Sequence, residues 1–395
     1  MELAVRGGHS SYATCQGGLL INTSGMQDIR IHPEMRRAKI QSGVLAGQLD
    51  RSTAPFGIAA VLGECASIGL SGLTLGGGLG RLMGQHGALC DTVLNAEVVT
   101  ADGQIRQVDE NNHRDLFWAI RGGSGNFGVV TSIDYRLFPV TQVLAGSLQY
   151  RLSEARKVLK LFGQFMKDAP DSVDALIEMG SGILQYTENG NVPVVVIHIC
   201  CGGDLETAKK TLQPLRHWGT VQSNTIKPMS YFEVQGSCDL RDLLEFMRGD
   251  FTGYRHSGFV ESLSDAVVDI VVGHCEDPTF PGWSVAFDHY LHGEICRVPQ
   301  DTCAFNLRVP GFSFRVAAFQ KGSVSPDAVK NWVRSLTDSL EPFSGGRIYL
   351  NYLTDQGNAG VRAALGNHYP KLAALKQKYD PHNLFHLNPN IPPQS

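Results

Sequence analysis

The chain has 395 residues, of which 43% are hydrophobic and 18% are charged, and its formal net charge is −4. This composition is typical of a globular protein with a large core, and the length predicts roughly two or three domains. A slightly acidic balance argues against a nucleic-acid-binding surface. The sequence contains no apolar run of about 18 residues, so it does not predict a membrane-spanning helix. Nine cysteines without a Cys-x-x-Cys pair favour neither a disulfide framework nor a metal site.

The first 139 residues predict short strands, hairpins and short helices around two glycine-rich segments. Because regular strand–helix–strand spacing is missing, this pattern favours an α+β architecture over a doubly wound parallel sheet. The Asp-Gly pair at 102–103 predicts a hairpin between its two flanking strands. Strands are expected at 3–5, 18–22, 29–31, 38–41, 94–100, 105–108 and 129–137, and short helices at 48–54 and 113–120.

Residues 140–345 predict a second unit, in which a sheet is covered by helices. Apolar residues recur at helical spacing in this region, and glycine is sparse. Strands are expected at 144–152, 172–179, 193–200 and 314–319, and helices at 154–166, 204–218 and 326–340. Residues 346–395 return to the style of the first part, with a strand expected at 346–353 and a helix at 372–379.

Segment 63–80 is the most distinctive part of the chain, because seven of its eighteen residues are glycine. Glycine permits positive φ and the close approach of a ligand, so the segment suits a cofactor cradle; a turn between packed elements would explain it as well. A nicotinamide site is disfavoured. Gly78-Leu79-Gly80 is followed by Met83 where the third glycine of the dinucleotide fingerprint should stand.

Four sequence blocks occur in a characteristic order: Val5-Arg6-Gly7-Gly8-His9-Ser10, segment 63–80, residues 115–131 with a second glycine-rich loop, and Tyr349-Leu350-Asn351-Tyr352 with residues 376–392. Together they resemble the FAD-linked oxidases of the berberine-bridge-enzyme type, within the vanillyl-alcohol-oxidase-like flavoproteins. The resemblance implies a discontinuous PCMH-type FAD-binding domain at 1–139 and 346–395. It also implies an inserted substrate domain of antiparallel sheet and helices at 140–345.

The resemblance implies FAD as a covalently held cofactor. His9 matches the histidine that bonds the flavin 8α-methyl group, and Cys65 matches the cysteine that some members bond to flavin C6. Imidazole and thiolate are nucleophiles suited to such additions. The implied cofactor-binding residues are Arg6, Gly7, Gly8, His9, Ser10, Cys65, Ile68, Gly69, Leu73, Gly76, Gly77, Gly78, Val130, Asn388 and Asn390.

The same resemblance makes Tyr352 the expected base that deprotonates a substrate hydroxyl, with Tyr349 and Asn351 supporting the pocket. An aromatic side chain packed in the core is the alternative interpretation of Tyr352. Because a tyrosine ordinarily has a pKa of about 10, such a base needs a nearby positive charge or hydrogen bonds.

The implied reaction is hydride transfer from an alcohol, sugar or secondary metabolite to FAD, with O₂ as the electron acceptor. No nucleic-acid or membrane partner is expected. The alternative is a truncated, non-catalytic relative that binds FAD weakly or not at all. It is motivated by the few residues that precede the Arg6–His9 loop, where family members carry a further subdomain, and by a loop one residue shorter than the family pattern. Localisation and oligomeric state stay open.

Overall fold

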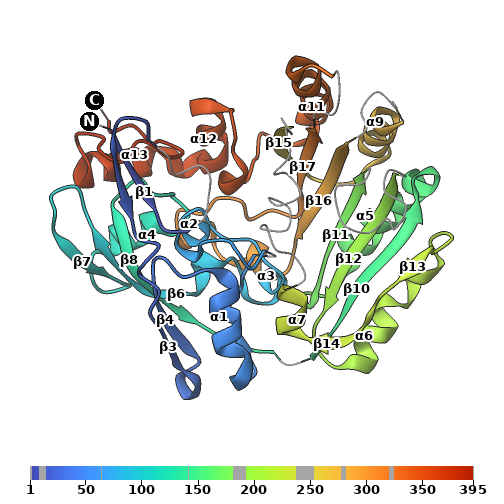
Figure 1. The fold of residues 1–395 in the computed structure, drawn as a ribbon, viewed down its shortest axis with the longest axis horizontal. Helices are drawn as coiled ribbons and strands as arrows, with labels where there is room; N and C mark the ends of the chain where they lie inside the picture. The colour runs from blue at the N-terminus through green and yellow to red at the C-terminus, as the bar shows by residue number, and fades with distance from the viewer. Residues whose placement is uncertain are drawn as a thin grey trace.

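The computed structural model describes residues 2–8, 15–63, 65–140, 142–180, 193–236, 253–276, 282–319 and 324–394. Two sheets stand side by side, one built by the early part of the chain and the other by its middle (Figure 1). The C-terminal helices lie with the first sheet (Figure 1). Apolar residues of the C-terminal segment also join the first sheet's core, among them Ile348, Leu372 and Ile391.

The first sheet is antiparallel, with strand order β3-β4-β8-β6-β7. Two short strand pairs flank it: β1 runs parallel to β2, and β5 runs antiparallel to β9. The strands are β1 (Leu3–Arg6), β2 (Leu19–Asn22), β3 (Ile29–His32), β4 (Arg37–Gln41), β5 (Ile58–Ala59), β6 (Val93–Val99), β7 (Ile105–Val108), β8 (Val129–Arg136) and β9 (Phe138–Pro139).

The second sheet is antiparallel, in the order β13-β10-β12-β11-β16-β17-β15, and β14 also pairs with β10. Its strands are β10 (Gln142–Arg151), β11 (Val173–Gly180), β12 (Val194–Cys201), β13 (Ser223–Asn224), β14 (Lys227–Ser230), β15 (Gly253–Val260), β16 (Trp283–Leu291) and β17 (Gly311–Phe319).

One face of the second sheet is covered by helices α5 (Ala155–Asp168), α6 (Leu205–Leu212), α9 (Asp265–Cys275) and α11 (Pro326–Leu340). Strand side chains alternate between faces, and in β11 the residues Ala175, Ile177 and Met179 join this helix-covered core. Asp174 and Glu178 therefore lie on the opposite face. That face turns toward the first sheet, where Ala145 and Cys200 share a cluster with Tyr349.

The remaining α-helices of the described residues belong mostly to the first sheet and its loops. They are α1 (Ala46–Thr53), α2 (Leu70–Leu75), α3 (Met83–His86), α4 (Arg114–Ile120), α7 (Tyr231–Gln235), α10 (Glu294–Arg297), α12 (Gly357–Leu365) and α13 (Tyr369–Tyr379). Among the described residues, no helix is both long and apolar enough to cross a membrane.

The predicted α+β class, the β6–β7 hairpin and the helix-covered antiparallel sheet are confirmed. The strand predicted at 346–353 is wrong, because this segment ends in a 3-10 helix, η8 (Leu350–Tyr352). The Tyr352 and Leu353 amides donate to backbone oxygens three residues earlier, so the segment bonds to itself and not to a neighbouring strand. Segment 63–80, for which no helix was predicted, contains α2. Strands β15 and β16 were not predicted either.

Candidate active site at the junction of the two sheets

The Arg6–Gly8 loop, which ends β1, lies directly against the start of α2. A Cβ on Gly8 would approach the Gly69 Cα to 2.6 Å, and a Cβ on Gly69 would approach the Gly8 Cα to 2.9 Å. Real Cβ atoms do not approach this closely, so both positions require glycine. The structure thus brings together two of the segments predicted to bind the cofactor, and Cys65, which is half-buried, lies just before this crossing.

The second half of segment 63–80 forms a turn that holds the C-terminal Tyr349. The amides of Gly78 and Leu79 donate to the Tyr349 hydroxyl at 3.0 and 3.3 Å. Asn351 Nδ2 also donates to that hydroxyl, at 2.9 Å, and to the Leu73 carbonyl at 3.0 Å. Burial raises the pKa of Tyr349 to about 12. Tyr349 is therefore a neutral anchor for the glycine turn and is unsuited to be a base.

The glycines of this turn are required by neighbouring protein atoms. A Cβ on Gly76 would lie 1.8 Å from Asn351 Oδ1, and one on Gly77 would lie 2.4 Å from the Phe305 ring. Gly77 and Gly78 also have positive φ, of 118° and 87°. The composition of the turn is thus explained by packing, which was one of the two interpretations of the sequence.

We expect Gly76→Ala to lower the free energy of unfolding by about 1–3 kcal/mol, because the added methyl must displace the half-buried, hydrogen-bonded Asn351 amide. Gly273→Ala is the matched control. A Cβ on this α9 glycine would meet no atom within 4 Å, and alanine is the better helix former by roughly 1 kcal/mol. Denaturant unfolding of both variants measures the difference. Equal stabilities would contradict the assigned packing.

The second glycine-rich loop is tied to the C-terminal tail. Asn126 Nδ2 donates to the carbonyls of Gly123 and Pro389 at 2.9 and 3.0 Å, and its Oδ1 accepts the Ile391 amide at 3.0 Å. Asn388 Nδ2 reaches the Gly125 carbonyl at 3.2 Å. The amides of residues 122 and 124 donate to the carbonyl of residue 75, which joins this loop to the first glycine segment.

Tyr352 lies between Tyr349 and a charged pair on the second sheet. Its ring meets the Tyr349 ring edge-on at a centroid distance of 4.9 Å, and the Arg315 guanidinium is 5.8 Å from its centroid. Arg315, on β17, forms a two-pronged ion pair with Asp288 at 2.6 Å for both contacts. The Arg315 side chain is 39% exposed, whereas that of Asp288 is 1% exposed. A fixed cation therefore stands beside a half-buried tyrosine.

The pair formed by Arg315 and Asp288 was missed by the sequence reasoning, because nothing local marks either residue. On the same face of the sheet, Ser257 donates its hydroxyl to the Tyr352 carbonyl at 2.6 Å, which ties η8 to β15. Burial alone would lower the pKa of Arg315, but the Asp288 carboxylate raises it well above its ordinary value. The cation consequently persists throughout the physiological pH range.

A buried polar network lies where Arg81, just after the glycine turn, meets the second sheet. Arg81 is 3.5 Å from Asp174, and His289 is 3.6 Å from the other oxygen of that carboxylate. Burial opposes ionisation of Asp174, but His289 and Arg81 hold its pKa below the ordinary value. Burial and Arg81 lower the pKa of nearby His198 to about 4, so this ring is neutral at pH 7.

Four polar residues of the second unit, His256, His289, His292 and Arg297, lie differently with respect to the buried junction. His256 pairs in register with Val316 of the helix-covered core, so it lies on the face away from the glycine turn. His292 bonds the Val173 carbonyl at 2.9 Å, and Arg297 pairs with Asp171 and Glu294 at the surface. Only His289 joins the buried junction.

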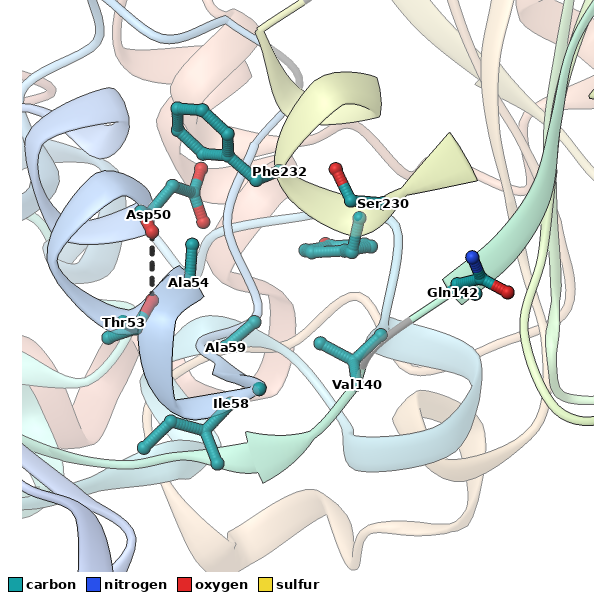
Figure 2. A pocket seen from close by; sticks show the side chains of 11 residues that line it. Asp50, Thr53, Ala54, Ile58, Ala59, Val140, Gln142, Ser230 and Phe232 are labelled. Atoms are coloured by element: carbon teal, nitrogen blue, oxygen red, sulfur yellow. Dashed lines mark hydrogen bonds between the residues drawn. The ribbon is translucent and has the colours of Figure 1, made fainter. Parts of the chain in front are cut away.

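A cleft of about 230 Å³ opens where the chain crosses from the first sheet to the second. Figure 2 shows Asp50 beside Phe232 on one side, with Val140 and Gln142 on the other. Burial raises the pKa of Asp50 to about 7, although a hydrogen bond with Gln235 opposes the shift. Gln235 also donates to the Gly63 carbonyl at 3.2 Å, so α7 links this cleft to the start of segment 63–80.

The raised pKa of Asp50 predicts a pH-dependent stability. The folded chain keeps this proton up to about pH 7, whereas the unfolded chain loses it near 3.8. Between these values the folded state binds more protons, so the free energy of unfolding falls as pH rises, by up to about 1.4 kcal/mol per pH unit. Asp50→Asn should remove this contribution in denaturant unfolding across that range. An unchanged slope would refute it.

The other residues predicted to bind the cofactor fall in different places. Val130 is buried in the core of the first sheet, whereas Ile68, which precedes α2, and Leu73, which lies within α2, are partly buried. His9 and Ser10 lie outside the described residues.

The loops around α2 and the C-terminal tail fit the cofactor that the resemblance implies. The Oδ1 atoms of Asn388 and Asn390 are buried without a hydrogen-bond partner among the described residues. A Cβ on neighbouring Gly125 would meet only Asn388 Nδ2, at 3.7 Å, so the backbone is open there. Buried amide oxygens need donors, and the hydroxyls and ring N–H of FAD are donors of the required kind.

Comparison with known proteins supports the same conclusion. The FAD binding domain family matches residues 1–109, and the berberine and berberine-like family matches residues 348–392. (R)-6-hydroxynicotine oxidase of Paenarthrobacter nicotinovorans is 29% identical, over 100% of this chain and 86% of its own. An FAD-linked oxidoreductase of Dictyostelium discoideum is 28% identical, over 98% and 82% respectively.

The crystal structure of 6-hydroxy-D-nicotine oxidase from Arthrobacter nicotinovorans matches with a TM-score of 0.86 and 25% identity, over 100% of this chain and 87% of that one. The predicted resemblance to berberine-bridge-type flavoproteins is therefore confirmed. The chain is therefore an FAD-linked oxidoreductase that resembles these proteins, and the matches favour an enzyme over a non-catalytic fold.

Proposed function

We propose that the protein is an oxidase in which bound FAD accepts a hydride from a small-molecule alcohol, sugar or secondary metabolite and O₂ takes the electrons. The observation that carries this proposal is the position of Tyr352 between the glycine-turn anchor Tyr349 and the Arg315 cation. We also propose residues 1–139 with 346–395 as the FAD domain and 140–345 as the substrate domain. The two separate sheets support this division.

In this proposal Tyr352 takes the proton from the substrate hydroxyl. A tyrosinate is stabilised by a nearby positive charge, and Arg315 supplies one that the buried Asp288 fixes in place. Tyr349 and Asn351 hold the segment against the glycine turn. Their role is positioning, because the raised pKa of Tyr349 keeps its proton in place.

The cofactor supplies the redox chemistry when it is bound, and the chain supplies its binding and orientation. Residues 6–10, the α2 segment with Gly69, and the amides of Asn388 and Asn390 are proposed to hold it. Covalent attachment at His9, with a second bond at Cys65, is proposed from the sequence motifs alone. Cys65 is half-buried, which is compatible with such a bond.

Intact mass and peptide mapping of the purified protein test this proposal. The expected result is one FAD per chain on the peptide that contains His9, with or without a link to the peptide that contains Cys65. A chain isolated without flavin should gain thermal stability when FAD is added, because a ligand that binds only the folded state raises the melting temperature. The proposal would be refuted by a colourless protein whose melting temperature does not change when FAD is added.

A further inference from the structure

Two buried thiols face each other across the junction of the two units, at a point that the proposed chemistry does not use. Cys90 lies in the 3-10 helix η3 (Leu89–Thr92), and Cys303 follows η6 (Gln300–Thr302). Their sulfur atoms are 3.9 Å apart although the residues are 213 positions apart in sequence, and both side chains are fully buried. A disulfide bond is about 2.05 Å long, so the two sulfurs would have to approach each other by roughly 2 Å to form one.

A guanidinium group contacts one of these sulfurs. Arg308 donates to Cys303 Sγ at 3.1 Å and holds Asp91 with two hydrogen bonds, at 2.6 and 3.0 Å. The hydrogen bond shared with Cys90 lowers the pKa of Cys303, and Arg308 and Arg121 act in the same direction, against the opposing effects of burial and of the Asp91 carboxylate. Burial raises the pKa of Cys90. The pair is therefore asymmetric: the pKa of Cys303 is lowered and that of Cys90 is raised, so Cys303 is the more readily ionised of the two.

The same atoms satisfy the distance criterion for a metal site, since ligand atoms of Cys90, Asp91 and Cys303 lie within 4.8 Å of one another. Arg308, however, occupies both Asp91 oxygens and neutralises their charge. A structural zinc site needs four ligands, with the thiolates free of competing cations. The geometry therefore favours reaction between the two sulfurs over metal binding.

The thiol pair is attached to the candidate active site through the glycine turn. The Cys90 amide donates to the Gly77 carbonyl at 2.8 Å, and the Leu89 amide donates to the Gly78 carbonyl at 2.8 Å. Gly78 in turn donates to Tyr349, and a Cβ on Gly77 would strike the Phe305 ring, two residues after Cys303. A shift of either cysteine is thus passed to the turn that carries Tyr349.

We propose that Cys90 and Cys303 form an oxidisable dithiol, which hydrogen peroxide converts to a disulfide that joins the two units. The Cys303 thiolate attacks one peroxide oxygen, the O–O bond breaks and hydroxide leaves, so sulfur loses two electrons and becomes a sulfenic acid. The Cys90 thiol then attacks that sulfur, the S–S bond forms, and the thiol proton leaves with the sulfenic OH as water.

The formation of this disulfide does not depend on the proposed function, because added peroxide is a sufficient oxidant. If O₂ accepts the electrons in turnover, the enzyme also releases this oxidant itself. The coupling to activity does rest on the proposed function. Drawing the two sulfurs together pulls on residues 77–78, and we expect turnover to fall on oxidation and to recover with a thiol reductant.

The test treats the folded, reduced full-length protein with hydrogen peroxide, blocks the remaining thiols and maps the peptides. The expected result is the loss of two free thiols and a reductant-sensitive cross-link between the Cys90 and Cys303 peptides. Cys303→Ser and Cys90→Ser should each abolish the cross-link. Cys275→Ser, which removes a buried thiol of α9, should retain it.

The disulfide would be overturned, whether or not the protein is an oxidase, if both thiols were still alkylatable after peroxide or if stoichiometric zinc protected them. Oxidation of Cys303 beyond the sulfenic acid while Cys90 stays free would also overturn it. A fully cross-linked protein with unchanged turnover would overturn only the coupling to Tyr349. Absence of any flavin-dependent turnover, together with an intact cross-link, would refute the proposed function and leave the thiol pair standing.

Discussion

Replacing Tyr352 by phenylalanine is expected to lower the rate of substrate oxidation by about 10²–10⁴-fold, which is the usual contribution of a general base. The ring would keep its edge-on contact with Tyr349, at a centroid distance of 4.9 Å, so cofactor binding should stay intact. The measurement is anaerobic, single-turnover reduction of the flavin as a function of pH. The wild-type rate should rise with ionisation of the base, and the variant should lose that pH dependence.

Tyr369→Phe is the matched control, because this tyrosine lies on α13 against Arg362, with the guanidinium 4.1 Å from its ring centroid, and has no role in the proposed site. Its rate should equal that of the wild type. A Tyr352→Phe variant that reduces its flavin at the wild-type rate would show that Tyr352 is only a packed aromatic residue. The base would then have to be sought elsewhere on the face of the second sheet that turns toward the first sheet.

Replacing Lys376 by methionine is expected to lower the free energy of unfolding by about 3–5 kcal/mol, because the change leaves a buried charge without its partner. The side chains of Lys376 and Asp380 are both 0% exposed, and their ion pair is 2.7 Å long. Lys376 also donates to the carbonyls of Asn126 and Phe385, at 2.8 and 2.9 Å. The amine therefore joins α13, the second glycine-rich loop and the C-terminal tail.

Lys378→Met is the control in the same helix. Lys378 pairs with Asp115 at 2.6 Å, but its side chain is 59% exposed, so the expected loss is below about 1 kcal/mol. Denaturant unfolding of both variants measures the contrast. Similar losses for the two variants would mean that the buried amine is not what fixes the tail. In that case the double variant Lys376→Met/Asp380→Leu should have no higher free energy of unfolding than Lys376→Met alone.

Regular elements could be predicted where the periodicity of the sequence agrees with the packing. In α11, Trp332, Leu336 and Leu340 recur at helical spacing and are all buried against the second sheet, and the helix was predicted at 326–340. The segment around Tyr349 misled for the opposite reason. Its apolar and aromatic residues suit a strand, but its backbone bonds to itself and its side chains reach the distant glycine turn.

The sequence by itself determined the type of protein, because the glycine-rich segments, the Arg6–His9 loop and the Tyr349–Tyr352 block are local patterns whose order can be recognised. It also showed where glycine is concentrated. Only the tertiary structure decided what those glycines touch. Gly76 and Gly77 make room for Asn351 and Phe305, residues more than two hundred positions away.

The charged groups of the site were likewise decided by the tertiary structure. Arg315 and Asp288 lie on neighbouring strands of a sheet, and they meet Tyr352 only because that sheet turns its open face toward the first unit. The same holds for Cys90 and Cys303, whose sulfurs are brought to 3.9 Å by a fold and not by a motif. Interactions between residues so distant in sequence depend on topology, and no local spacing predicts them.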